Sequence, residues 1–333
     1  MGYWEGGFSW ARLQNFVRRR THPCGISTVL CCSGLDAWHI MNYPPYFPAR
    51  HVAGGSPGVG KTQLCMQLAL DVQIPPELGG VAGEALYIDT EGSMMANRLD
   101  QIATSLHKHL KAVATRTQGA SSPLATTIEK RCTPAVLLEH VHLLRVTELG
   151  EQISALASLP RFLERHPAVR LVVLDSVTFH FRYAESAAAN RIDTRARLLQ
   201  SLSQALHRAA ASYNVAVVVI NQMTTRFRQD MGAASSMTGD EDTGRLVPAL
   251  GESWAHACTN RIILRWDAAG VRVAQLVKSP SQRSGEVRYA VTPEGVRGYK
   301  APAAAVVSQT LEQPPIGRKR TAADAGFEND SSR

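Results

Sequence analysis

One short stretch constrains the fold of this chain more than any other. It matches the pattern G-x-x-x-x-G-K-[ST] and reads Gly55-Ser56-Pro57-Gly58-Val59-Gly60-Lys61-Thr62. In such a P-loop the glycines let backbone N–H groups turn toward phosphate oxygens, the lysine reaches the β- and γ-phosphates, and the threonine hydroxyl meets Mg²⁺. Gln63 and apolar residues at helical spacing follow, so the loop is expected at a helix N-terminus, where the helix dipole favours anions. The stretch predicts a nucleoside triphosphate site.

Composition and charge limit the class of protein. The 333 residues are 44% hydrophobic and 19% charged, which is typical of a chain with an ordinary globular core. Lysines and arginines outnumber acids 36 to 28, and the net charge of +8 is compatible with a polyanionic partner. No stretch approaches the roughly 18 apolar residues of a membrane span, so no membrane partner is expected. The six cysteines show no C-x-x-C pair, and neither a disulfide framework nor a zinc ribbon is indicated.

Short apolar runs alternate with helical patterns after the P-loop, which is the signature of a parallel sheet with crossover helices. The candidate strands cover residues 85–89, 142–147, 170–175 and 215–220. A helix with Leu199, Leu202 and Leu206 on one face is expected between the last two strands. Further runs, expected as antiparallel additions to one edge, lie at residues 261–265, 271–277 and 287–291. The prediction is an α/β fold with a twisted, mostly parallel sheet flanked by helices.

The chain is expected to have three parts. Residues 1–50 show no sustained period and form an irregular N-terminal segment, residues 51–300 form the nucleotide-binding domain, and residues 301–333 form a flexible basic tail. The tail contains Gly317-Arg318-Lys319-Arg320, a cluster that resembles a nuclear import signal. A mitochondrial address around Arg18-Arg19-Arg20 is the alternative for localisation, unless that run is a solvated basic patch.

Acidic residues at two predicted strand ends are expected to complete the phosphate site. The run Leu171-Val172-Val173-Leu174 ends in Asp175, and a buried parallel strand would carry that carboxylate to the ligand-binding edge of the sheet. There it is expected to support Mg²⁺ by contacting one of the ligands of the ion. The alternative is that Asp175 only caps the following turn. Glu91 follows the strand at residues 85–89 and is a candidate to orient the attacking water, with Asp89 as its rival.

A neutral amide ends the last of these strands. Gln222 can hydrogen-bond a γ-phosphate and move when that phosphate leaves. The alternative is a polar residue that only satisfies its own hydrogen bonds, because amides are common at strand ends.

These motifs, in this order and spacing, resemble the RecA/RadA strand-exchange superfamily. Within it the chain is most similar to the eukaryotic recombinase paralogues of the C type. The distinguishing stretches are residues 58–69, 79–85, 246–254 and 278–282. The resemblance covers most of residues 54–300 and implies a RecA-like P-loop NTPase core.

The resemblance also implies an activity. Members of this group are slow, DNA-dependent ATPases of homologous recombination and double-strand-break repair; they use ATP and Mg²⁺ and work in the nucleus. Their partners are single-stranded or branched DNA, sister paralogues in a hetero-oligomer, and the recombinase filament. By the family's motif, Lys61 and Thr62 contact the triphosphate and Mg²⁺, and Asp175 supports the metal. Glu91 activates water and Gln222 senses the γ-phosphate, so Lys61, Glu91 and Gln222 form the catalytic set.

Further contacts follow from the same resemblance. Arg98 matches an arginine that stacks on adenine, its alternative being a solvated helix residue. Two loops after the strands of Asp175 and Gln222 face the DNA in the family. Their candidates for DNA contact are Arg182, Tyr183, Arg191, Arg226 and Arg228. The second loop also carries an acidic cluster that opposes binding of a polyanion, and a disordered insertion is the alternative there: Asp230, Asp240, Glu241 and Asp242.

The chain departs from the family before the P-loop. Residues 37–53 resemble nothing in the family pattern, and only His51-Val52-Ala53 remains as a strand to feed the loop. The expected consequence is a poorly anchored loop, and the rival function is therefore a non-catalytic scaffold with a disabled nucleotide site. A ring helicase or a kinase is a second rival. Phe8-Ser9-Trp10-Ala11 fits the Phe-x-x-Ala pattern by which neighbours dock in family filaments.

Overall fold

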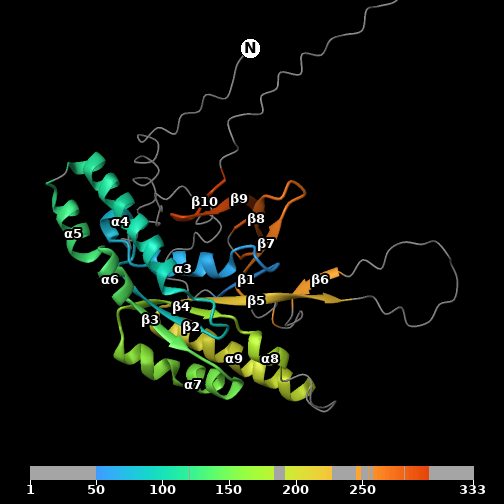
Figure 1. The fold of residues 1–333 in the computed structure, drawn as a ribbon. Helices are drawn as coiled ribbons and strands as arrows, with labels where there is room; N and C mark the ends of the chain where they lie inside the picture. Colours follow the sequence, from blue (N-terminus) through green and yellow to red (C-terminus); the bar gives the residue numbers. More distant parts are fainter. Residues whose placement is uncertain are drawn as a thin grey trace, which may run out of the picture. The chain divides into compact units, whose positions relative to one another are not determined.

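A ten-stranded sheet organises the chain. The computed structural model describes residues 50–119, 121–183, 192–226, 245–248, 254, 258–280 and 282–299. The strand order is β10-β9-β8-β7-β1-β5-β4-β2-β3, with β6 paired to β5 off this path (Figure 1). The strands are β1 (Arg50–Gly55), β2 (Glu84–Asp89), β3 (Val141–Arg145), β4 (Val169–Asp175), β5 (Ala216–Arg226), β6 (Arg245–Pro248), β7 (Asn260–Trp266), β8 (Arg272–Lys278), β9 (Gly285–Thr292) and β10 (Gly295–Gly298).

The sheet is parallel from β7 through β1, β5, β4 and β2 to β3, and antiparallel from β7 to β10. This arrangement confirms the predicted α/β fold with antiparallel strands added at one edge. All seven predicted strands are present, most with ends shifted by one or two residues; β5 instead continues six residues further, to Arg226. Two strands were not predicted. β10 is only four residues long, and β6 exists because β5 extends far enough to pair with it.

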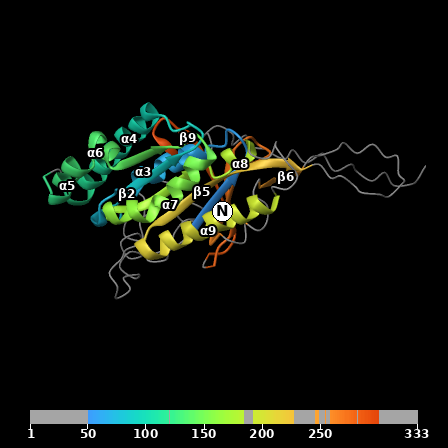
Figure 2. The same cartoon turned by 90° about the horizontal axis from the view of Figure 1, so that it is seen from below.

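Helices cover both faces of the sheet. They are α3 (Lys61–Asp71), the 3-10 turn η1 (Pro76–Leu78), α4 (Ala96–Gln118), α5 (Pro123–Arg131), α6 (Pro134–Glu139), α7 (Leu149–Arg165), α8 (Phe179–Tyr183) and α9 (Ile192–Tyr213). One buried core joins α3, α4, α5 and α6 to one face, and a second joins α7, α8 and α9 to the other (Figures 1 and 2). None of the described helices is both long and apolar enough to cross a bilayer.

Local sequence signals explain where several helices begin and which side they bury. Ser122 and Thr133 accept hydrogen bonds from the backbone of the first turns of α5 and α6, and a proline follows each cap. In α9 the predicted apolar face is buried, including Leu199, Leu202 and Leu206. That face packs on the sheet beside α7, so the prediction for this helix is confirmed.

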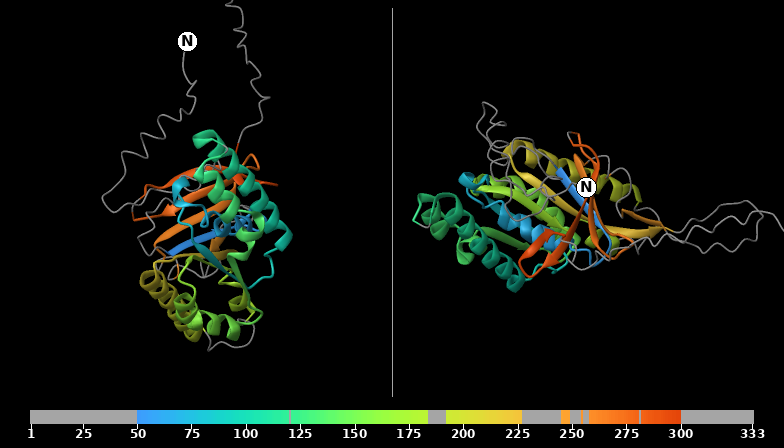
Figure 3. Two further views of the ribbon diagram at one scale, coloured as in Figure 1. Left: turned by 90° about the vertical axis from the view of Figure 1, so that its left-hand side faces the viewer. Right: turned by 90° about the horizontal axis from the view of Figure 1, so that it is seen from above.

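Strands β8, β9 and β10 curl over α3, so that this helix lies between them and the parallel part of the sheet (Figure 3). Their inward residues Leu276, Tyr289 and Val296 belong to the same core as α3. The antiparallel edge therefore forms one wall beside the start of α3.

The strand before the P-loop is better anchored than the sequence predicted. β1 lies in the middle of the sheet and pairs along its length with β5 on one side and with β7 on the other. The expectation of a strand limited to three residues was wrong, because Gly54 and Gly55 continue the pairing into the loop. Parallel pairing uses backbone groups, so the unfamiliar side chains upstream do not prevent it.

Gly55 and Gly54 provide a matched test of this anchoring. A Cβ on Gly55 would lie 2.3 Å from the backbone oxygen of Leu264, whereas a Cβ on Gly54 would meet no atom closer than 3.6 Å. We expect Gly55→Ala to lower the free energy of unfolding by roughly 1–3 kcal/mol, because β1 and β7 must move apart. Gly54→Ala is the control and should change it by less than about 1 kcal/mol. Urea unfolding of both variants measures the difference; equal midpoints would contradict the close packing of β1 on β7.

Candidate functional site

The P-loop joins the carboxyl end of β1 to the amino end of α3. Gly58 and Gly60 have positive φ angles of 72° and 102°, which glycine adopts without strain. The first N–H groups of α3 have no acceptor within the helix and point into the loop. The Nζ of Lys61 donates hydrogen bonds of 2.9 Å to the carbonyls of Gly55 and Ser56, so the ammonium group lies across the loop.

Tyr289 fixes the loop from the antiparallel edge. Its hydroxyl donates a 2.8 Å hydrogen bond to the carbonyl of Val59, and both residues are buried. Burial raises the pKa of the Tyr289 hydroxyl, so this donor stays protonated. A Cβ at Gly60 would also crowd Val291 of β9, at 2.9 Å. The loop is thus packed between its own helix and β9.

Asp175, at the end of β4, joins three segments of the site. Its Oδ2 accepts a 2.7 Å hydrogen bond from Thr62 of α3 and a 2.8 Å hydrogen bond from Tyr87 of β2. The side chain is buried, and desolvation raises its pKa although both hydrogen bonds act in the opposite direction. The carboxylate therefore contacts the P-loop threonine directly and does more than cap a turn.

The ammonium of Lys61 lies near the carboxylates of Glu91 and Asp175. Burial lowers its pKa, and the negative charges of Glu91 and Asp175 act against that shift. One lysine and two carboxylates thus occupy a partly desolvated region, where electrostatic interactions are stronger than in water.

Asp89 shapes the loop after β2. Its Oδ1 accepts hydrogen bonds from the backbone N–H groups of Glu91 and Gly92, at 3.1 and 2.8 Å. Arg145, the last residue of β3, contacts the same oxygen at 3.1 Å. Because Asp89 is occupied by its own loop and by Arg145, Glu91 is the acid of the pair that is turned toward other segments.

Glu91 and Gln222 are brought together by the tertiary structure. The Nε2 of Gln222 donates a 2.6 Å hydrogen bond to Oε1 of Glu91, and the hydroxyl of Ser176 donates to the same oxygen. The backbone N–H of Gln222 donates to Thr178 at 3.3 Å. Neighbouring strands place these groups side by side, since β5 adjoins β4 and β4 adjoins β2. Gln222 lies within β5 and not at its end as the sequence predicted, because β5 continues to Arg226.

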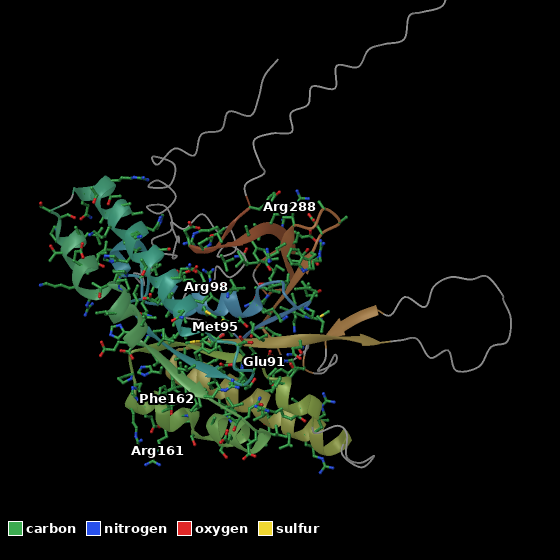
Figure 4. The ribbon with its side chains drawn as sticks, viewed as in Figure 1. Glu91, Met95, Arg98, Arg161, Phe162 and Arg288 are labelled. Carbon is green, nitrogen blue, oxygen red and sulfur yellow. The ribbon has the colours of Figure 1, made fainter. Side chains whose placement is uncertain are left out.

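Arg98, near the start of α4, is partly exposed and bonds to α3 and to the turn after β9. Its Nε donates to Gln63 of α3 at 2.7 Å, and its terminal nitrogens donate to the carbonyls of Thr292 and Pro293 at 2.6 and 2.8 Å. Figure 4 labels Arg98 and Met95 beside α3. A cavity of about 430 Å³ opens here, lined by Gly58, Gly60, Gln63, Arg98, Gln101, Arg272, Val291, Thr292 and Pro293.

The predicted DNA contacts are only partly described. Arg182 and Tyr183 lie in α8, directly after the strand of Asp175, and Arg226 is the last residue of β5. Arg191 and Arg228 lie outside the described residues, as do the acidic cluster, the Phe-x-x-Ala sequence and the basic cluster of the tail.

Several residues that build the site were missed by sequence reasoning. Tyr87, Arg145, Ser176 and Tyr289 all hold a predicted site residue or the P-loop. The sequence pattern around Tyr87 and Tyr289 predicts core residues of strands. Nothing in that pattern indicates that their hydroxyl groups bond to Asp175 and to the P-loop. Ser176 had a signal, since it directly follows Asp175 at a strand end.

Comparison with known proteins places the chain among recombination proteins. The family model described as Rad51 matches residues 53–122 and 124–299. The "DNA repair protein RAD51 homolog 3" of Cricetulus griseus is 40% identical over 270 residues, which are 80% of this chain and 67% of the hamster protein. The protein of the same name from Dictyostelium discoideum is 38% identical over 250 residues, 74% of this chain and 60% of its own length.

These matches confirm the resemblance to recombinase paralogues of the C type, since both relatives carry the name homolog 3. They cover the strands and loops that carry the phosphate site, from β1 to β10. With a family match across more than half of its length, the chain belongs to the Rad51 family.

Proposed function

We propose that this chain binds ATP with Mg²⁺ and hydrolyses it slowly in a DNA-dependent reaction of homologous recombination and double-strand-break repair. The single observation that carries the proposal is the cluster of Lys61, Thr62, Asp175, Glu91 and Gln222. Residues from α3, from the loop after β2, from the end of β4 and from within β5 meet there through the bonds Thr62–Asp175 and Gln222–Glu91. Rad51 family members are RecA-like ATPases, and the matched relatives are named DNA repair proteins.

The residues present suit a magnesium triphosphate. Hard oxygen donors are what Mg²⁺ prefers, and the Thr62 hydroxyl and the Asp175 carboxylate, 2.7 Å apart, supply them. Asp175 is buried with a raised pKa, so a cation nearby would offset the cost of its negative charge. The N–H groups at the start of α3 and the ammonium of Lys61 suit phosphate oxygens. When bound, Mg²⁺ neutralises charge on the β- and γ-phosphates.

The side chains divide the work of hydrolysis. Thr62 and Asp175 would hold Mg²⁺. The ammonium of Lys61, which bonds to the carbonyls of Gly55 and Ser56, would exchange them for the phosphate oxygens of the bound nucleotide. Ser176 and Gln222 hold Oε1 of Glu91, which leaves Oε2 to accept a proton from the attacking water. As the water oxygen bonds to the γ-phosphorus, the bond from that phosphorus to the β–γ bridging oxygen breaks, and ADP and phosphate are the products.

The cavity beside Arg98 suits the base of the nucleotide. It adjoins Gly58 and Gly60 of the P-loop, and Arg98 and Pro293 stand on its border. The hydrogen bonds of Arg98 to Gln63 and to the Thr292–Pro293 backbone orient its planar guanidinium, which can stack on an adenine ring.

DNA contact is assigned to the segments that follow β4 and β5. Gln222 lies four residues before Arg226 on β5, so a change at the γ-phosphate side can be passed along the strand toward that end. Arg182, Tyr183, Arg191, Arg226 and Arg228 are the proposed contacts, by phosphate pairing and base stacking. The proposed partners are sister paralogues and the recombinase filament, and the proposed location is the nucleus.

The rival function is a scaffold that binds partners without using nucleotide. Its motivation was a weak strand before the P-loop, and the full pairing of β1 on both sides favours the ATPase instead. A helicase or a kinase remains a rival of another class, which strand-separation and phosphotransfer assays address.

Replacing Lys61 distinguishes the ATPase from the scaffold. We expect Lys61→Ala to weaken ATP binding by about 10- to 100-fold, because charge-assisted hydrogen bonds to phosphate are lost. DNA-stimulated turnover should fall with it. Lys108→Ala, which removes an exposed lysine of α4, is the control and should match the wild type. Equal and negligible ATP binding by all three proteins would support the scaffold.

Glu91→Gln separates chemistry from binding. Because the amide cannot take a proton from water, kcat should fall by roughly 10²-fold or more while the Kd for ATP stays within about threefold. Asp89→Asn should instead disturb the loop and weaken binding as well, since Asp89 holds the backbone of Glu91 and Gly92. Glu139→Gln, an exposed residue of α6, is the neutral control. Single-turnover hydrolysis and nucleotide titration give both quantities; unchanged kcat in Glu91→Gln would remove Glu91 from its role.

The raised pKa of Asp175 predicts how the stability of the protein depends on pH. Burial raises its pKa in the folded protein above the ordinary value of 3.8. The neutral form is therefore favoured by folding, and its contribution to stability is complete below the unfolded pKa and is lost as the pH rises through the raised folded pKa. Without nucleotide, the stability of Asp175→Asn relative to wild type should increase with pH across this window and then level off. Urea unfolding from pH 4 upward measures it, and a constant difference would contradict the cause given for the shift.

A further inference from the structure

Two histidines and a glutamate converge at the amino end of β2, away from the phosphate site. They are Glu84, the first residue of β2, His142 of β3, and His166 in the turn between α7 and β4. One donor atom from each side chain lies within 4.8 Å of the other two. The Nε2 of His142 is 2.7 Å from Oε2 of Glu84. Glu91 follows the opposite end of β2, so this cluster has no part in the proposed hydrolysis.

The two imidazole rings are positioned by packing. The ring of Phe162 stacks on His166 with centroids 4.3 Å apart, and it makes a T-shaped contact with His142 with centroids 5.6 Å apart. The backbone of His166 is held on both sides, since its N–H donates to Phe162 and its carbonyl accepts from Val169. Figure 4 labels Phe162 on α7, well apart from Glu91. Little side-chain freedom is therefore left to be lost when a ligand binds.

The donor set selects a class of ligand. Two imidazoles and one carboxylate form the three-ligand set that zinc takes in sites with an open fourth position. Imidazole nitrogens do not suit Mg²⁺ or Ca²⁺, which prefer oxygen. Side chains of Glu84 and His142 are 23% and 27% exposed, so an ion can reach them from solution while the surroundings exclude part of the water. Bond lengths of about 2.0–2.2 Å in a tetrahedral site put donor atoms roughly 3.3–3.6 Å apart. The pair of His142 and Glu84 must therefore open from 2.7 Å, and donor atoms that lie up to 4.8 Å apart must close in, both by rotation of side-chain torsions.

The positive charge of Arg170 acts against a cation here. Arg170 packs against Gly83, next to Glu84, but its guanidinium donates to the carbonyls of Pro167 and Val169, at 2.8 and 3.1 Å. These bonds keep its charge on the turn. A second histidine–glutamate pair, His107 and Glu129, lies 3.7 Å apart in α4 and α5 and has no third ligand in a cluster of this kind among the described residues.

We propose that Glu84, His142 and His166 form a binding site for one zinc-class divalent cation. The ion would tie β2, β3 and the α7–β4 turn together. β3 is the last strand on its side of the described sheet and exposes Leu143 and Leu144, so its pairing has support from one neighbour only. A metal link at its start stabilises this edge independently of nucleotide.

The site is tested by metal binding to the full chain after removal of metals with a chelator. The probe is Zn²⁺ in calorimetry and Co²⁺ in visible absorption, which reports four-coordinate geometry. We expect the wild type to bind one more Zn²⁺ than His166→Gln or His142→Gln, because the 11 histidines and 6 cysteines of the chain can give a background common to all proteins. His107→Gln is the matched control and should keep the additional ion.

Thermal unfolding gives a second readout. With saturating Zn²⁺ the midpoint of the wild type should rise by several degrees more than that of His166→Gln, since a ligand that binds only the folded state stabilises it. Glu84→Gln, which keeps the shape of the side chain, serves where a histidine variant is unstable without metal. The proposal is overturned if all variants bind the same number of ions, or if His107→Gln loses as much as His166→Gln. ATP binding should be retained throughout, so the result is separate from the test of the ATPase.

Discussion

The contact between Asp175 and Thr62 is the interaction on which the site depends. One carboxylate oxygen of Asp175 accepts hydrogen bonds from the hydroxyl groups of Thr62 and Tyr87. It thereby connects the P-loop helix, β2 and β4 in the interior. An ionised carboxylate is costly to bury, and the raised pKa of Asp175 reflects that cost. A protein keeps such a group where a cation or a strong donor meets it, and here Lys61 and the proposed Mg²⁺ fill that role. The stability of this region is thus linked to its ligand.

Further contacts decide which of two acids, Asp89 at the end of β2 or Glu91 after it, faces the neighbouring strands. Asp89 organises the loop after β2 and leaves Glu91 free to reach Ser176 and Gln222. Strand pairing makes this possible, because Asp89 lies opposite Asp175 in the register and Gly55 lies opposite Gln222. The carboxyl ends of β1, β2 and β4 therefore lie beside Gln222 of β5 at one edge, as expected for ligand sites of parallel sheets. The histidine–glutamate cluster lies at the amino end of β2, so the two sites use opposite ends of one strand.

Much of this was predictable from the sequence because it follows from local patterns. Short apolar runs marked the strands, apolar residues at helical spacing marked α9, and the P-loop motif marked its own helix. The anchoring of the loop was not predictable. His51-Val52-Ala53 looked too short to hold it, yet β1 pairs on both sides and Gly55 packs against Leu264. Backbone hydrogen bonds to distant strands leave no mark in the side-chain pattern, so the strength of this strand was underestimated.

The sequence by itself determined the phosphate loop, the runs along the chain that form the strands beside Glu91, Asp175 and Gln222, and the family to which the chain belongs. Only the tertiary structure decided which acid is held by its loop, which tyrosine hydroxyls hold the P-loop and Asp175, and which histidines meet Glu84. The physical reason is the separation along the chain of the residues that interact. Motifs and periodicity arise from neighbours along the chain, whereas a hydrogen bond such as Tyr289 to Val59 joins residues 230 positions apart and exists only once the sheet has brought them together.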